Sequence, residues 1–104
     1  MGNYRIDVSE PAEKDLHDIV RYISAQLSAP ITASKMMDVV EEAIMDLAVM
    51  PQKCPHVTDE RLAMMGYRKL LVKNYIIFFT IDEKSRVVNV ERILYARRDW
   101  YHIL

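Results

Sequence analysis

The stretch "YRKLLVKNYIIFFTID", residues 67–82, decides the fold class of this chain. Its second part, "YIIFFTI" at 75–81, is continuously apolar, which is typical of a central strand that is covered on both faces. The run before it, at 67–73, also has the composition of a strand, and the acidic turn "DEKS" after it leads to "VVNVERILY" at 87–95. The second half of the chain therefore predicts three consecutive strands.

A strand and a helix are predicted at the N-terminus. In "YRIDVS" the apolar Tyr4, Ile6 and Val8 alternate with charged residues, which indicates a half-buried strand. Ser9 can cap a helix, because its hydroxyl can accept a hydrogen bond from one of the first amides, which lack intrahelical partners. The apolar residues of this helix recur at a spacing of three or four and predict one buried face: Ala12, Leu16, Ile19, Val20, Ile23 and Leu27.

A second amphipathic helix is predicted after a break at Pro30. It should begin near Thr32 and end before Pro51, and its apolar residues are Met36, Met37, Val40, Ile44, Leu47 and Ala48. About five residues join the two helices, which therefore predict an antiparallel hairpin. Residues 51–65 contain two prolines and no clean period, and we interpret them as a loop.

The order of these elements predicts an α+β fold, β-α-α-β-β-β with a short terminal tail, in one domain over residues 1–104. The helix hairpin should pack on one face of a small, twisted, mainly antiparallel four-stranded sheet, with the basic tail at the edge of the other face. Strict alternation in the last strand would place Val88, Val90, Arg92 and Leu94 on one face and Asn89, Glu91, Ile93 and Tyr95 on the other.

The composition limits the class of protein. Of the 104 residues 51% are hydrophobic, which suffices for one core. The one cysteine, Cys54, excludes an internal disulfide and a cysteine-based zinc site, and neither His17 nor His56 has a second ligand at metal-binding spacing. No apolar run approaches the ~18 to 20 residues of a membrane span and no signal peptide precedes the first strand, so we expect a soluble cytoplasmic protein without a cofactor.

The charge is divided unevenly along the chain. Residues 1–60 carry 5 Lys and Arg against 11 Asp and Glu, a net −6, whereas residues 61–104 carry 9 against 4, a net +5. Such an asymmetry is typical of a surface that meets an anion, nucleic acid above all, although solvated charge without a partner gives the same pattern. The final stretch, "RILYARRDWYHIL" at 92–104, combines these cations with aromatic side chains.

The tail begins with Arg97 and Arg98, which should leave the sheet where a concave face could begin. The alternative for Arg98 is an exposed ion pair with the aspartate that follows it or with another neighbour. Trp100, Ile103 and Leu104 have the spacing of one face of a short helix, and we expect them to pack their apolar side rather than to stack on bases.

With this order of elements the chain resembles the RelE/ParE family of toxins from bacterial type II toxin–antitoxin systems. The resemblance covers nearly the whole chain and rests on "LAVMP" at the end of the second helix, "YRKLLVKNYIIFFTID" and "VERILYARRDW". It implies a growth-inhibiting toxin with a cognate antitoxin as partner, and we expect the antitoxin to cover the basic half with an acidic, amphipathic segment that folds on binding. Two targets stay open, because RelE-like members cut mRNA on the ribosome whereas ParE-like members inhibit DNA gyrase and catalyse nothing.

The first hypothesis is a ribosome-dependent mRNA endoribonuclease, in which a 2′-hydroxyl attacks the adjacent phosphate. This reaction requires a base, an acid and cations that stabilise the phosphorane. The resemblance implies that Arg97 is catalytic and binds the scissile phosphate, with Arg68 and Lys69 holding the RNA backbone. Tyr101 and His102 lie near the tail tyrosine of the family and are the candidates for proton transfer.

One position departs from the RelE-like pattern. The apolar strand there commonly opens with Tyr-Arg, the arginine being catalytic, whereas this chain has Tyr75 followed by Ile76. Arg92 on the neighbouring strand could supply the missing cation, and Arg98 a further contact to the substrate. Gyrase inhibition is therefore the alternative hypothesis. A third is a protein-binding module without toxicity, which would not arrest growth on expression.

Overall fold

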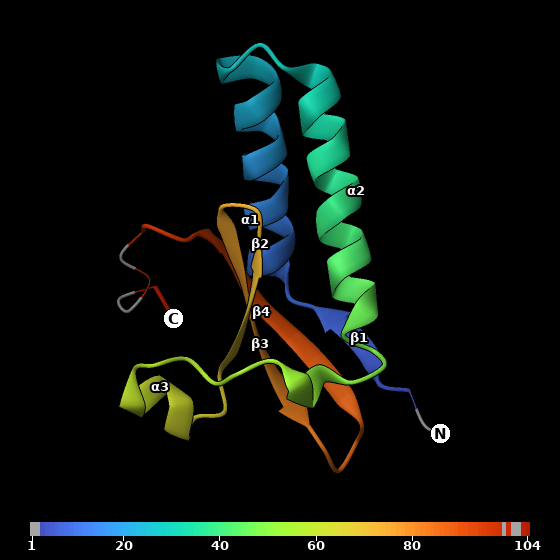
Figure 1. Cartoon of the computed structure of the whole chain (residues 1–104), viewed down its shortest axis with the longest axis vertical. Helices are drawn as coiled ribbons and strands as arrows, with labels where there is room; N and C mark the ends of the chain where they lie inside the picture. The colour runs from blue at the N-terminus through green and yellow to red at the C-terminus, as the bar shows by residue number, and fades with distance from the viewer. Residues whose placement is uncertain (1–2, 99, 101–102) are drawn as a thin grey trace.

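The computed structural model describes residues 3–98, 100, 103 and 104. Its elements are β1 Arg5–Val8, α1 Glu10–Arg21, the π-helical turn η1 Tyr22–Gln26, α2 Pro30–Asp46, the 3-10 turn η2 Pro51–Lys53, α3 Glu60–Met64, β2 Arg68–Val72, β3 Tyr75–Asp82 and β4 Val87–Tyr95 (Figure 1). No helix in this part of the chain is long and apolar enough to cross a membrane.

The four strands form one sheet in the order β1-β4-β3-β2. β1 runs parallel to β4, and the β4–β3 and β3–β2 pairs are antiparallel. This confirms the predicted α+β fold with a mainly antiparallel sheet. β3 and β4 are the inner strands, and β1 and β2 are the two edges.

The helix hairpin of α1 and α2 packs on one face of the sheet, as predicted. Ser9 caps α1, since its hydroxyl accepts the Ala12 N–H at 3.1 Å. The apolar faces of the helices and the sheet form one core of buried residues: Ala12, Leu16, Val40, Ile44, Val72, Ile77, Val90 and Ile93. Figure 1 shows that the hairpin extends well beyond the end of the sheet, so that the tip around η1 has no strand beneath it.

The sheet face opposite α1 and α2, here called the far face, is covered by the segment around α3 and by the tail. The buried residues of this second core are Val57, Leu62, Ile76, Phe78, Leu94 and Trp100. Ile103 and Leu104 pack against it, so the apolar residues of the tail pack as predicted. Both faces of β3 are covered, which accounts for its continuous apolar run.

Two boundary predictions were wrong. α2 begins at Pro30 rather than near Thr32, because proline suits the first helical position, where an N–H would lack a partner anyway. Residues 51–65 are not a plain loop: they contain η2 and α3, and α3 is capped by the Asp59 carboxylate, which accepts the Leu62 N–H at 2.9 Å.

Strict alternation in β4 was also wrong. Phe78 pairs with Arg92 and Phe79 pairs with Val90, so Glu91 is an extra residue that has no partner opposite it on β3. This bulge reverses the alternation after it. Val90 and Ile93 therefore both belong to the core under the helices. The Arg92 side chain leaves the backbone on the opposite face of β4 from Val90.

Candidate functional site

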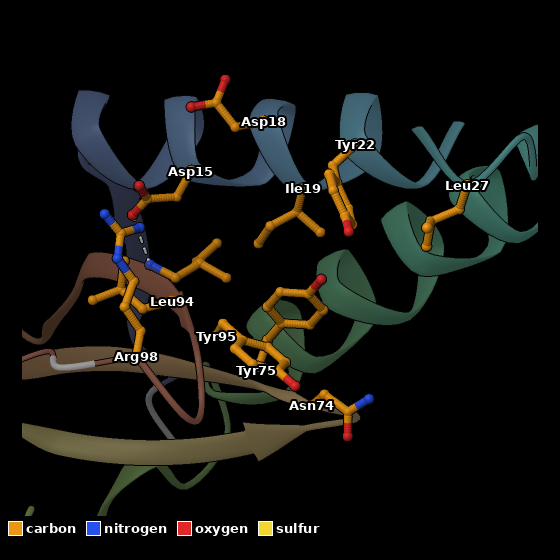
Figure 2. A pocket seen from close by; sticks show the side chains of 11 residues that line it. Asp15, Asp18, Ile19, Tyr22, Leu27, Asn74, Tyr75, Leu94, Tyr95 and Arg98 are labelled. Atoms are coloured by element: carbon orange, nitrogen blue, oxygen red, sulfur yellow. Dashed lines mark hydrogen bonds between the residues drawn. The ribbon is translucent and has the colours of Figure 1, made fainter. Parts of the chain in front are cut away.

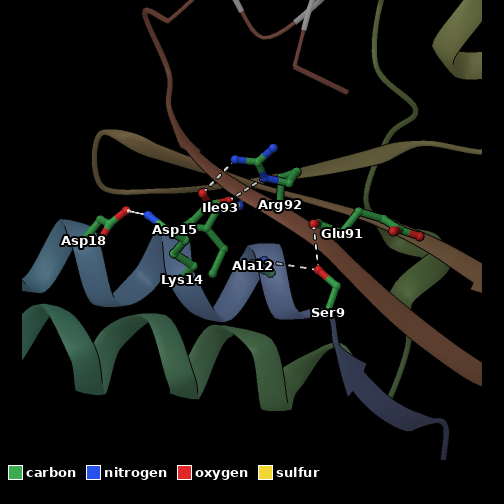
Figure 3. Close-up of polar contacts among 8 residues, drawn as sticks. All are labelled: Ser9, Ala12, Lys14, Asp15, Asp18, Glu91, Arg92 and Ile93. Carbon is green, nitrogen blue, oxygen red and sulfur yellow. Dashed lines mark hydrogen bonds and ion pairs between the residues drawn. The ribbon is translucent and has the colours of Figure 1, made fainter.

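Along the edge opposite β3, the end of β4 is held by α1 instead of by another strand. β1 pairs only with the first part of β4, and side chains at the start of α1 bind the backbone groups that follow. The Ser9 hydroxyl donates to the Glu91 carbonyl at 2.8 Å, and the Asp15 carboxylate accepts the Ile93 N–H at 2.9 Å (Figure 3). The position of α1 is thus coupled to the course of β4.

Arg92 is bound to the same carboxylate. Its Nε and Nη2 donate to the two oxygens of Asp15 at 2.7 and 2.8 Å, which makes a two-bond ion pair (Figure 3). The side chains are 25% and 11% exposed. The hydrogen bond to Asp15 raises the pKa of Arg92 above its ordinary value, so the guanidinium keeps its charge. Arg92, which the sequence suggested as a substrate-binding residue, is therefore engaged within the protein.

Arg68 also has partners within the protein. At the start of β2 its Nη1 donates to the backbone carbonyls of Gln52 and Cys54 at 3.1 and 2.6 Å. These bonds tie the η2 segment to the sheet. Arg68 was predicted to bind phosphate, but one of its two terminal guanidinium nitrogens therefore forms hydrogen bonds within the fold.

The position where the resemblance expects a catalytic arginine lies in the far-face core. Ile76 is 8% exposed, and the Trp100 ring lies against Phe78 with 4.9 Å between centroids. Phe78 stands in register between Lys69 of β2 and Arg92 of β4. Because neighbouring strands are ~4.8 Å apart, the backbones of these two basic residues are separated by ~10 Å, with a covered phenylalanine between them.

The remaining predicted site residues are in or near the tail. Arg97 and Arg98 follow β4 and are exposed, and within the described residues neither side chain forms an ion pair. The Arg98 N–H donates to the Tyr95 carbonyl at 3.0 Å, which fixes the turn after β4. Tyr101 and His102 lie outside the described residues, and their roles stay predictions.

A cavity of about 580 Å³ opens where the helix hairpin extends past the sheet. It lies between α1 with η1 on one side and the adjoining ends of β3 and β4 on the other (Figure 2). Charged residues stand at one end of it, namely Asp15, Asp18 and Arg98. Apolar and aromatic residues form the other end, namely Ile19, Tyr22, Leu27, Tyr75 and Tyr95. We call it the aromatic cavity.

The aromatic end of this cavity has the properties of a protein-binding surface. Tyr22, Leu27 and Tyr95 are 53%, 55% and 43% exposed, although all three side chains are large and mainly apolar. The Tyr75 and Tyr95 rings meet edge to face with 5.8 Å between centroids. Burial, with Tyr95 and Tyr22 nearby, raises the pKa of Tyr75, so its phenol stays neutral near pH 7. Exposed aromatic surface of this kind commonly contacts other proteins.

The sequence did not reveal this cavity. It placed Leu27 on the buried face of the first helix, which was wrong, because the chain leaves α-helical geometry at η1. There the Leu27 N–H donates to the Tyr22 carbonyl, five residues earlier, at 3.2 Å. A turn of this type shifts the phase of the helix, so the 3.6-residue period no longer applies, and such turns are frequent at functional sites.

Comparison with known proteins places residues 6–100 in a family described as the ParE toxin of the type II toxin–antitoxin system parDE. A solved structure of a chromosomal ParDE toxin–antitoxin system from P. aeruginosa superimposes with a TM-score of 0.74 at 18% identity, over 90% of this chain and 97% of that chain. The toxin–antitoxin complex RelBE2 from Mycobacterium tuberculosis gives 0.67 at 19% identity, over 89% and 98% of the two chains. At these identities the structures show a shared fold. No curated protein sequence matches.

Proposed function

The chain belongs to the ParE toxin family of type II toxin–antitoxin systems, and from this premise we propose that it arrests growth by binding and inhibiting DNA gyrase, without catalysing a reaction. We propose further that a cognate antitoxin neutralises it and that it meets both partners in the cytoplasm. The antitoxin is supported by the similarity to two chains that come from a toxin–antitoxin system and a toxin–antitoxin complex.

The observation that carries this proposal is the ion pair between Arg92 and Asp15. RNA cleavage needs a cation in place of the one missing at Ile76, and Arg92 is the nearest candidate on the neighbouring strand. Its guanidinium already makes two hydrogen bonds to a carboxylate that is 11% exposed. A phosphate would have to compete with that carboxylate, which also holds the Ile93 N–H.

The covered far face and the aromatic cavity point in the same direction. The sheet surface between Lys69 and Arg92 is filled by Phe78 and Trp100, so no open basic cleft lies there among the described residues. The aromatic cavity instead offers exposed rings at one end and the Arg98 side chain at the other, a combination that suits contact with a protein. We propose it as the surface that contacts gyrase.

Endoribonuclease activity remains the second candidate, and Arg97 is the residue that favours it. Its guanidinium is exposed and makes no ion pair within the described residues, as a phosphate ligand would require. If it stabilises a phosphorane, Arg97→Ala should lower the rate of cleavage at least about a hundredfold, and Arg97→Lys should restore little of it. If the protein only binds, there is no cleavage for either variant to lose.

Two assays run on the same preparation separate these functions. Relaxed plasmid, ATP and gyrase report supercoiling, and programmed ribosomes with primer extension report mRNA cleavage. We expect blocked supercoiling and intact mRNA. Cleaved mRNA with normal supercoiling would overturn the proposal in favour of the endoribonuclease, and activity in neither assay would favour a binding module without toxicity.

A further inference from the structure

The outer edge of β2 is only partly covered. β3 occupies its inner edge, and the segment that precedes β2 pairs with the first part of its outer edge. There the Val57 N–H donates to the Tyr67 carbonyl and the Lys69 N–H donates to the Pro55 carbonyl, both at 3.1 Å. This short ladder goes no further, because the chain before Pro55 is folded into η2.

Beyond that point the outward backbone groups of β2 have no partner among the described residues. Pro55 has no N–H, so it cannot donate to the Lys69 carbonyl. The N–H and C=O groups of alternate residues in a strand point to the same edge, and the Lys69 N–H points outward, so those of Leu71 point outward as well. The Leu71 side chain is 66% exposed. An exposed apolar residue with free backbone groups is the arrangement that accepts an added strand.

A cavity of about 560 Å³ lies beside this edge. Its apolar lining is made of Cys54, Pro55, Leu70, Leu71 and Ile76. Burial raises the pKa of the Cys54 thiol, so this side chain stays neutral. Within the described part of the chain, the charged lining residues are Lys53 and Lys69, no Asp or Glu lines the cavity, and neither lysine has an ion pair.

We propose that the outer edge of β2 from Lys69 to Val72 is the docking site of an extended, acidic segment of the antitoxin, which adds a strand to the sheet. The name of the partner rests on the proposed function, whereas the chemistry of the segment comes from this edge. Side chains at every second position of an added strand share one face, and Lys69 and Leu71, two positions apart, share one face of β2 with Ile76. The same face of the added strand must therefore carry a carboxylate opposite the lysines and an apolar residue opposite Leu71 and Ile76.

Charge argues against two other occupants. A second copy of this chain would bring its own two lysines to the same edge, and like charges facing one another oppose pairing. A nucleic acid strand would satisfy the lysines but would leave Leu71 without an apolar partner. Among the residues that the structure describes, no aromatic side chain on which a base could stack lines this cavity.

The test uses the whole ¹⁵N-labelled chain and a short end-blocked peptide of repeating Glu-Glu-Val-Val, in which each face of the strand carries both residue types. We expect saturable shift changes at the amides of Lys69 and Leu71, slower hydrogen exchange of the Leu71 amide, and weaker binding as salt rises. A peptide of repeating Lys-Lys-Val-Val is the charge control and should not bind.

Two pairs of variants locate the contact. Leu71→Pro removes the outward N–H but leaves the bonds of its neighbours to β3, and it should raise the dissociation constant about tenfold or more. Leu71→Ala keeps the N–H and should have a smaller effect. Lys53→Glu with Lys69→Glu should abolish binding without touching the core, whereas Lys35→Glu with Lys84→Glu, exposed elsewhere, should leave it unchanged.

The proposal is overturned if the Lys–Val peptide binds equally well, if Leu71→Pro folds and binds like the wild type, or if the shifts appear at the aromatic cavity instead. An oligoribonucleotide that binds the same amides more tightly would reassign the edge to nucleic acid. Shifts that depend on protein concentration alone would reassign it to a second copy. A preparation that binds the peptide but leaves supercoiling intact contradicts the gyrase proposal alone, and the reverse outcome contradicts this inference alone.

Discussion

The Arg92 guanidinium and the Asp15 carboxylate are joined by two hydrogen bonds, of 2.7 and 2.8 Å, although 77 positions separate them in the chain. The same carboxylate accepts the Ile93 N–H. A single side chain of α1 therefore sets the direction of a sheet arginine and closes the edge of β4 where β1 has ended. A basic residue that looks available for an anion in the sequence is thereby part of the structural framework.

Removing Asp15 should destabilise the protein. Asp15→Ala leaves a partly buried guanidinium unpaired and the Ile93 N–H without a partner, and we expect a loss of about 2 to 4 kcal/mol in the free energy of unfolding by urea. The matched control is Asp18→Ala one turn later, whose ion pair with Lys14 is exposed and whose loss should not shift the urea midpoint measurably. Equal midpoints for the two variants would contradict the structural role of Asp15.

The core between the helices and the sheet should respond to truncation. Leu16→Ala or Ile44→Ala removes buried methylenes and leaves a cavity, so each should cost roughly 2 to 5 kcal/mol in thermal denaturation. Ile31→Ala, at a side chain that is 73% exposed, serves as the control and should leave the melting temperature nearly unchanged. Wild-type melting of both core variants would mean that the helix hairpin does not pack as described.

The aromatic cavity is tested by Tyr22→Ala. Because this ring is 53% exposed, the fold should survive, while the concentration for half-maximal inhibition of supercoiling should rise by about tenfold or more. Ile31→Ala, exposed near the tip of the same hairpin, should inhibit like the wild type. Unchanged inhibition by the Tyr22 variant would place the gyrase contact elsewhere.

The loss of stability at acid pH should depend on Glu83. The Tyr4 hydroxyl donates to its carboxylate at 2.6 Å and the Gln52 amide donates at 3.0 Å, and these bonds hold the pKa of Glu83 below its ordinary value of 4.5. A carboxyl whose pKa is lower in the folded state stabilises the protein above its unfolded-state pKa, and this stabilisation is lost as the pH falls through the folded-state value. Glu83→Gln should therefore flatten the fall of the melting temperature below about pH 4.5, whereas Glu42→Gln, at an exposed position of α2, should retain it.

Local patterns in the sequence determined the elements and their order. Apolar spacing in α1 identified Leu16 as a core residue, the continuous apolar run identified β3 as an inner strand, and Ser9 identified the start of α1. The tail residue Trp100 was likewise expected to pack. These inferences hold because the period of apolar residues and the need to cap a helix are properties of a short segment, which the segment carries into any fold that buries it.

Only the tertiary structure decided which residues meet. The bulge at Glu91 depends on the register between β3 and β4, and it moved Val90 and Ile93 onto the same face against strict alternation. The partner of Arg92 depends on where α1 crosses the open edge of β4, and the exposure of Leu71 depends on where the segment before β2 turns away. A linear pattern reports which face of an element is apolar, but a hydrogen-bond partner or a free edge is a relation between segments far apart in the chain, and it exists only once they are packed together.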